Sequence, residues 1–148
     1  MPRRRVLAAL LPSLVLAVLL PGLAAPAAAE HEIFYRFTVL GYVKDARGKP
    51  VAEATVQVVR DRTGFSYLGA TDARGLFVVL TRLGDESVGE ALTVRQGTTE
   101  RRIAVAFDPT NHADERGTRV DFEGARAVEH AAWFRSTLLN VVGVTTRH

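Results

Sequence analysis

The chain has 148 residues, of which 47% are hydrophobic and 24% charged, the composition of one ordinary globular domain. It has no cysteine, so its stability must come from a hydrophobic core without disulfides. Its net charge of +3 comes from three arginines at positions 3–5, because 19 basic residues less these three leaves 16, which equals the 16 acidic ones. This balance excludes a nucleic-acid-binding protein of the usual basic kind.

Residues 1–29 have the pattern of a secretory signal peptide. The basic start is followed by an apolar run at 6–20 and by three alanines at 27–29, where a signal peptidase cuts. The run of 15 residues is shorter than the roughly 20 needed to span a bilayer. We therefore expect cleavage after Ala29 and a periplasmic or secreted protein. The alternative is that the segment is not cleaved and anchors the protein to a membrane.

After the signal, β-forming residues gather in seven segments that are separated by turn residues. The predicted strands are 33–44, 51–60, 65–71, 76–80, 90–96, 101–107 and 119–122. Both faces of the first strand are largely apolar, so we expect it to be covered on both sides. Seven short strands at this spacing predict an all-β, seven-stranded antiparallel Greek-key sandwich of the immunoglobulin-like kind, which occupies residues 30–123.

The tetrapeptide Asp-Ala-Arg-Gly occurs twice, at 45–48 and 72–75, each time shortly before a predicted strand. Aspartate at the first turn position caps the backbone that follows, and glycine at the fourth accepts a left-handed conformation. Both copies are therefore predicted to be structural turns. Any function is expected elsewhere, at the mature N-terminus, in the 108–117 loop or on the C-terminal helix.

The segment 124–148 is predicted to be a helix and a tail. Its apolar residues recur at helical spacing between 125 and 142: Ala127, Ala131, Phe134, Leu138 and Val141. We expect this helix to pack on the sandwich or beside it, and the sandwich to fold without it. The alternative is a helix that binds a partner or a membrane surface. Trp133 lies off the apolar stripe and would suit a partner contact, whereas the polar face lacks the lysines and arginines of an interfacial helix.

The residues around the two turns resemble those of a known module. The shared positions are Gly41, Val43, Asp45, Gly48, Pro50, Val51, Ala54, Val56 and Val58, then Thr71, Asp72, Gly75 and Phe77. On these positions the chain resembles the carboxypeptidase regulatory-like domain, one of the transthyretin-like (prealbumin-like) β-sandwiches. The resemblance implies an extracytoplasmic, non-catalytic accessory, binding or stability module, in a fold class that also includes carbohydrate-binding domains. It transfers no catalytic residue to this chain.

Enzymatic chemistry has little support in the sequence. Hydroxyisourate hydrolases, which are enzymatic relatives of this fold, end in Tyr-Arg-Gly-Ser, whereas 144–148 reads Val-Thr-Thr-Arg-His. Ser66 lies in a Gly-x-Ser-x-x-Gly segment of a predicted strand, and not in the Gly-x-Ser-x-Gly turn of a nucleophile elbow. No His-Glu-x-x-His zinc motif occurs. We therefore expect no enzyme and no cofactor other than a metal ion.

Two segments contain donors that suit a metal ion. Glu30 and His31 would begin the mature chain, where a free amine, backbone nitrogens and an imidazole bind Cu(II) or Ni(II). The 108–117 loop contains Asp108, His112 and Asp114, although without the Asp-x-Asp-x-Asp-Gly spacing of a calcium site. The alternative is that the first segment is a solvated tail and the second a hydrophilic connection.

The sequence thus predicts an exported, non-catalytic β-sandwich module that binds an unknown protein or ligand partner or acts structurally. Two other functions stay open. One is a periplasmic protein that binds or delivers Cu, Ni or Ca through the mature N-terminus and the 108–117 loop. The other is a carbohydrate-binding module, in which sugars would stack on Tyr35, Tyr42, Tyr67 or Trp133, residues that packing would otherwise explain.

Overall fold

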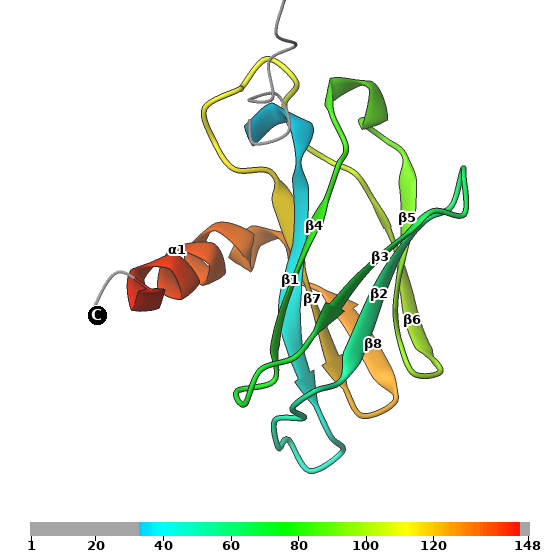
Figure 1. Ribbon diagram of the computed structural model, residues 1–148, viewed down its shortest axis with the longest axis vertical. Helices are drawn as coiled ribbons and strands as arrows, with labels where there is room; N and C mark the ends of the chain where they lie inside the picture. The colour runs from blue at the N-terminus through cyan, green and yellow to red at the C-terminus, as the bar shows by residue number, and fades with distance from the viewer. Residues whose placement is uncertain (1–32, 146–148) are drawn as a thin grey trace, which may run out of the picture.

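Two β-sheets of four strands each pack face to face in the computed structural model, which describes residues 33–145 (Figure 1). The first sheet has the order β4–β1–β7–β8, with β1 at Phe37–Lys44, β4 at Leu76–Thr81, β7 at Gly117–Glu123 and β8 at Arg126–Glu129. The second has the order β3–β2–β5–β6, with β2 at Thr55–Arg60, β3 at Ser66–Ala70, β5 at Ala91–Gln96 and β6 at Thr99–Ala104. The helical elements are the 3-10 helices η2 (Ile33–Tyr35), η3 (Asp85–Ser87) and η4 (Ala131–Trp133) and the α-helix α1 (Phe134–Thr145). The predicted signal peptide lies outside the described residues.

The prediction of a β-sandwich is confirmed, but seven antiparallel strands are not what the chain forms. The structure has an eighth strand, and β1 pairs with β7 in parallel, with Thr38 opposite Gly117 and Val43 opposite Phe122. The sheet orders support a two-sheet sandwich but not a Greek-key topology. Alternation along one strand reveals which face is buried, whereas the direction of its neighbour is decided only when the sheet assembles.

The predicted helix at 125–142 begins too early, because residues 126–129 form β8. Gly124, with a φ of +60°, turns the chain back directly after β7, and Glu123 then pairs with Arg126. Backbone hydrogen bonds to the open edge of β7 outweigh the weak helical periodicity of this segment. The part of the predicted apolar stripe that lies on α1 is Phe134, Leu138 and Val141. Among the described residues, no helix is both long and apolar enough to cross a membrane.

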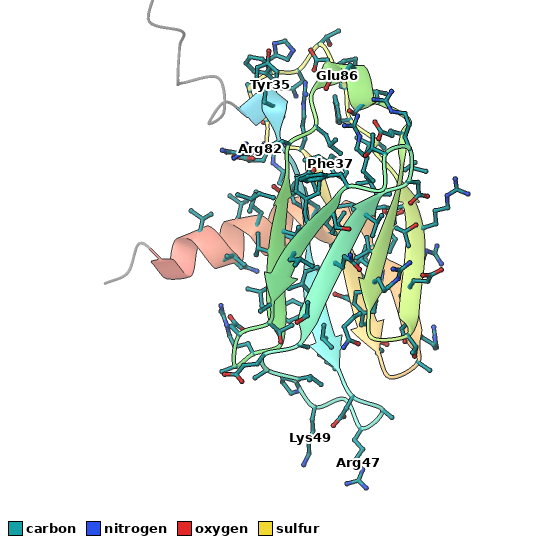
Figure 2. All side chains as sticks on the ribbon, turned by 45° about the vertical axis from the view of Figure 1, so that its right-hand side comes forward. Tyr35, Phe37, Arg47, Lys49, Arg82 and Glu86 are labelled. Carbon is teal, nitrogen blue, oxygen red and sulfur yellow. The ribbon has the colours of Figure 1, made fainter. Side chains whose placement is uncertain are left out.

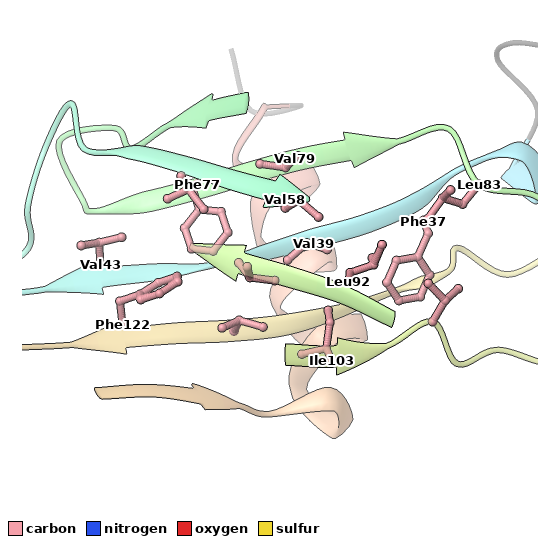
Figure 3. Packing of buried hydrophobic residues seen from close by; sticks show 14 residues of the cluster. Phe37, Val39, Val43, Val58, Phe77, Val79, Leu83, Leu92, Ile103 and Phe122 are labelled. Carbon is pink, nitrogen blue, oxygen red and sulfur yellow. The ribbon is translucent and has the colours of Figure 1, made fainter. Parts of the chain in front are cut away.

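The core lies between the two sheets and is built from the inward side chains of both (Figure 3). From β1, Phe37, Val39 and Val43 point inward and are at most 3% exposed. Phe77 of β4 and Phe122 of β7 approach to 6.1 Å between ring centroids. The other buried members of the cluster are Val56, Val58, Val79, Leu83, Leu92, Val94, Ile103, Val105 and Val120.

The central strand β1 is also buried on its outer face, as its sequence predicts. Thr38 and Leu40 point away from the core and are nevertheless only 2% and 0% exposed. A Cβ atom on Gly117, in the neighbouring strand, would lie 2.5 Å from the Phe134 ring. The beginning of α1 therefore rests directly on the outer face of the first sheet, and α1 then leads away from it (Figure 1).

Both Asp-Ala-Arg-Gly segments form the predicted turns. The Asp45 carboxylate accepts the backbone N–H groups of Arg47 and Lys49, and Asp72 caps its own turn in the same way. The last glycine of each turn has a left-handed φ, +79° in the first and +77° in the second. The side chains of Arg47 and Lys49 extend from one end of the sandwich, opposite the end that carries η2 and η3 (Figure 2).

Candidate functional site

The long loop between β6 and β7 meets α1 and forms a groove with it. The loop, residues 105–116, lies at the same end of the sandwich as η2 and η3 (Figure 1). Arg135 in the first turn of α1 donates to Asp114, with 2.8 Å between Nη2 and Oδ1. Two depressions of about 250 Å³ and 200 Å³ adjoin this contact, since Asp114, Glu115 and Arg135 line both of them. Together they are termed the loop–helix groove.

The two halves of the loop–helix groove differ in chemistry. The larger, polar half is also lined by Phe107, Asp108, Asn111 and Arg116. The smaller, apolar half is also lined by Ala113, Leu138 and Leu139. Leu139 is 65% exposed, so the described part of the chain leaves this half open to solvent. The groove therefore offers a place for a polar group beside a place for an apolar one.

Side chains fold the loop into a series of capped turns. Asp108 Oδ1 accepts the backbone N–H of Thr110 at 2.9 Å and its hydroxyl at 2.7 Å. Asn111 Oδ1 accepts the N–H groups of Ala113 and Asp114. Such bonds from Asp and Asn to residues two or three positions ahead hold a loop without regular secondary structure. The bonds from Thr110 also lower the pKa of Asp108, so this carboxylate is ionised at neutral pH.

Arg116 anchors the loop to the rest of this end of the sandwich. The residue is 3% exposed, and its Nη1 donates to the Phe34 carbonyl at 3.0 Å. Its Nη2 lies 2.8 Å from Asp85 and donates to the Asn111 carbonyl, while the guanidinium lies 3.9 Å from the centre of the Phe107 ring. Its Nε is buried and has no acceptor among the described residues. So many contacts to one buried guanidinium make the frame of the polar half rigid.

His112 is held by the carboxylate that pairs with Arg116. Its Nε2 lies 3.0 Å from Asp85 Oδ2, and its ring stacks on Phe34 with 4.8 Å between centroids. Desolvation raises the pKa of Asp85, but hydrogen bonds from Arg116 and His112 outweigh it, so the pKa of Asp85 lies below its ordinary value. Asp85 therefore stays ionised at neutral pH and ties the loop to η3.

The structure does not bring the predicted metal donors of the loop together. Asp108 is engaged by its own turn, His112 by Asp85, and Asp114 by Arg135. Within residues 33–145, no group of three or more His, Asp or Glu side chains is placed to hold one metal ion. The donors at positions 30 and 31 lie outside the described residues, so a metal site at the mature N-terminus stays a prediction.

A second cluster of polar and aromatic side chains lies on the outer face of the first sheet, where η4 and α1 begin. Asp121 is 3% exposed and accepts the Tyr42 N–H at 3.0 Å and Arg119 Nη2 at 2.9 Å. Arg119 Nη1 donates in turn to the Thr137 hydroxyl at 3.0 Å. The Arg119 guanidinium also lies 5.2 Å from the centre of the Trp133 ring. These contacts fasten the C-terminal segment to the sheet and have a structural role.

The four aromatic residues considered for sugar stacking lie on four different elements and pack against neighbours. Trp133 on η4 stacks on His130, with 4.0 Å between ring centroids and 10° between the planes. The tyrosines at 35, 42 and 67 lie on η2, β1 and β3 and contact Phe34, Arg119 and Phe65. Tyr42 and Trp133 both lie beside Arg119, and Tyr35 and Trp133 are 45% and 49% exposed, so a use of these rings in sugar stacking stays a prediction.

The serine hydroxyls of the described residues have partners other than histidine. Ser66 lies within β3 and accepts from Gln57 Nε2 at 2.8 Å, which agrees with its prediction as an ordinary strand residue. Ser87 is buried and accepts from Arg60 at 3.4 Å. Ser136 donates to a backbone carbonyl of η4 at 3.1 Å. Each hydroxyl thus serves a local structural bond.

The fold defines this chain as a two-sheet β-sandwich with a short C-terminal helix. No protein-family model matches the sequence, and no curated protein matches it. A solved structure similar to it is the dioxygenase domain of a dioxygenase carbohydrate-binding protein fusion from the cellulolytic bacterium Streptomyces sp. SirexAA-E. The two share 20% identity over 64% of this chain and 75% of that one, with a TM-score of 0.37. A likeness at this level supports no inference about activity.

The sequence singles out the loop and the C-terminal helix as separate candidates, and the structure joins them. The sequence does not single out several of the groove residues, among them Phe107, Arg116 and Arg135. Arg116 is a single cation just before a strand, and such a pattern is also common on exposed surfaces. Its burial follows only from the contacts of η2 and η3 with the loop. No local pattern marks these three residues as members of one site.

Proposed function

We propose that this protein is an exported, non-catalytic β-sandwich module of the carboxypeptidase regulatory-like kind, which binds a ligand or a segment of a partner protein in the loop–helix groove. The observation that carries the proposal is the groove itself, in which a polar half and an apolar half share Asp114, Glu115 and Arg135. Concave sites with apolar walls and a few convergent polar groups are the usual form of ligand sites.

The frame of the loop–helix groove supports binding because contacts of its own side chains hold it in place. Asp108 and Asn111 cap the turns of the loop, and Arg116 ties the loop to η2 and η3. Arg135 joins it to α1. A site that is already ordered loses less conformational entropy when a ligand binds, and therefore retains more of the interaction energy as affinity.

A binding role also fits the histidines better than a catalytic role does. His112 pairs with Asp85 at 3.0 Å, and His130 lies 3.8 Å from Asp121. Within the described residues, neither histidine has a bonded serine that it would activate as a nucleophile. Export is proposed on the pattern of the signal peptide at residues 1–29.

The proposed function is tested by NMR titration of the ¹⁵N-labelled purified protein with small probes of different chemistry. The peptide probes are Ac-Gly-X-Leu-Gly-amide, in which X is lysine, norleucine or glutamate. The sugar probes are the methyl glycosides of glucose and of N-acetylglucosamine. At least one probe is expected to shift the amide resonances of 107–116 and 135–139 at millimolar concentrations, the range expected for so small a ligand.

Two matched variants connect these shifts with the groove. Leu139→Ser is expected to weaken binding, because it removes the most exposed wall of the apolar half. Leu68→Ser on β3 is the control, since Leu68 is 68% exposed, close to the 65% of Leu139, and is not part of the groove. The proposal fails if no probe shifts the groove resonances or if both variants weaken binding equally.

A further inference from the structure

We infer that the loop–helix groove selects a peptide segment in which a basic residue stands next to an apolar residue. The inference rests on the proposed function, because it names the ligand class of the same groove. Three features of the lining carry it: a carboxylate without an ion pair, a buried donor without an acceptor, and an apolar wall that is open to solvent.

The carboxylate without an ion pair is that of Asp108, although the nearby charge of Arg116 contributes to the lowering of its pKa. The ion pairs made by the other charged side chains of the lining are Arg135–Asp114, Arg36–Glu115 and Arg116–Asp85. Asp108 forms no ion pair among the described residues, and both of its bonds from Thr110 end on Oδ1. Oδ2 is therefore free to accept an ammonium or guanidinium group in the polar half. The remaining charge of the lining is negative, which is complementary to a basic side chain.

The donor without an acceptor is Nε of Arg116. The Arg116 side chain lines the polar half and is 2% exposed, and its Nε has no partner among the described residues. A buried N–H without an acceptor is unfavourable, so a ligand acceptor that reached Nε would gain a hydrogen bond. A peptide brings such an acceptor in every backbone carbonyl. A bare cation would satisfy Asp108 but would leave Arg116 Nε unpaired.

The open apolar wall is formed by Leu138 and Leu139 with Ala113. It adjoins the polar half at Asp114, Glu115 and Arg135, so a basic residue in the polar half places its neighbour in the peptide near the leucines. Burial of an apolar side chain there stabilises the complex through the hydrophobic effect. The three features together therefore favour a peptide over other ligands. A neutral glycan would bring no cation to pair with Asp108, and an acidic segment would be repelled by it.

The test compares the three tetrapeptide probes on the purified protein and on one groove variant. The lysine probe is expected to bind about three- to fivefold more tightly than the norleucine probe, the range for an exposed ion pair, and the glutamate probe to bind most weakly. Asp108→Asn retains an acceptor for Thr110 and is expected to abolish the preference for lysine. The matched control is Asp45→Asn, because Asp45 caps a turn in the same way at the opposite end of the sandwich.

The outcomes separate this inference from the proposed function. Loss of the lysine preference in Asp108→Asn but not in Asp45→Asn supports both. If the three peptides bind the groove equally, if a methyl glycoside binds it more tightly, or if the lysine preference survives in Asp108→Asn, the inference is overturned while the groove remains a binding site. If none of the probes shifts the groove resonances, both are overturned.

Discussion

The parallel pairing of β1 with β7 depends on a glycine and an aspartate. The ladder between the two strands is interrupted at Gly41 and Tyr42. The Val120 carbonyl approaches so closely there that a Cβ atom on Gly41 would lie 1.7 Å from its oxygen. The Asp121 side chain replaces the missing backbone acceptor by taking the Tyr42 N–H at 3.0 Å. The two strands are thus joined through Gly41, which has no side chain, and through Asp121, whose carboxylate oxygens both accept hydrogen bonds.

Gly41→Ala is expected to lower the free energy of unfolding by about 3 kcal/mol or more, because β1 and β7 must separate to admit the methyl group. Urea denaturation measures the change. Gly143→Ala on α1 is the control, since among the described residues outside its own helix a Cβ atom there would meet no atom within 4 Å, and it is expected to change stability by less than about 1 kcal/mol. Equal losses in the two variants would contradict the role given to Gly41.

Among the elements, α1 and β8 differ in how far they belong to the sandwich. Phe134 and Thr137 in the first turns of α1 are 6% and 4% exposed, whereas Leu139 and Val142 are 65% and 52% exposed. The helix is therefore attached at its beginning, and its later turns lead away from the sheet (Figure 1). In contrast, β8 extends the first sheet and places Ala127 against the core. The sequence-based boundary of the sandwich, at residue 123, thus falls before β8 rather than after it.

Two truncations distinguish these elements. Removal of 131–148 is expected to leave a cooperatively melting sandwich with a lower Tm, because all strands remain while Gly117 loses the cover of Phe134. Removal of 124–148 also deletes β8 and is expected to lower the Tm by roughly a further 10 °C. Thermal melting followed by circular dichroism measures both. Identical Tm values would show that β8 adds nothing, and loss of the cooperative transition in the shorter truncation would show that the helix completes the core.

Over the whole molecule, carboxylates with a lowered pKa connect distant segments. Glu90 has a side chain that is only 9% exposed and accepts Arg60 Nη2 at 2.9 Å. Hydrogen bonding from Arg60 lowers the pKa of Glu90 and outweighs the opposite effect of burial. Bonds from Asn111 and then Arg135 lower the pKa of Asp114. The first contact joins β2 to the start of β5, and the second joins the groove loop to α1.

These shifts predict a loss of stability in acid. Because the pKa of Glu90 in the folded protein lies below its ordinary value of 4.5, the unfolded chain binds more protons at low pH. The contribution of Glu90 to the free energy of unfolding is therefore complete above pH 4.5. It is lost as the pH falls through the pKa that Glu90 has in the folded protein. We expect the free energy of unfolding to decline below about pH 4.5 in urea titrations at a series of pH values.

Glu90→Gln tests the source of this decline. It is expected to lower stability by about 2 kcal/mol at pH 7, as for a hydrogen bond between charged groups, and to make the decline in acid less steep. Glu100→Gln is the control, because Glu100 pairs with Arg95 while its side chain is 56% exposed, and surface pairs contribute little. A decline in acid that is as steep in Glu90→Gln as in the parent protein would contradict the assignment.

Local chemistry was sufficient to predict most of the region from β1 to β6. Asp45 and Asp72 cap turns that their own tetrapeptides specify, and the alternating apolar residues of β2 and β5 face the core. The predicted strand at 51–60 starts too early, because Glu53 has a left-handed φ of 57° in a turn before β2. The capped turns and the alternating strands depend on residues within a few positions of one another. These features can therefore be predicted from the sequence.

Only the tertiary structure decided the strand β8, the parallel pairing of β1 with β7, and the loop–helix groove. Residues 126–129 became a strand because β7 left an open edge beside them, and not because of their own pattern. The groove exists because Phe134 docks on Gly117 and so places α1 beside the loop. Each of these outcomes depends on which surfaces meet after the chain has folded, and contacts between residues far apart in the chain leave no local periodicity by which they can be predicted.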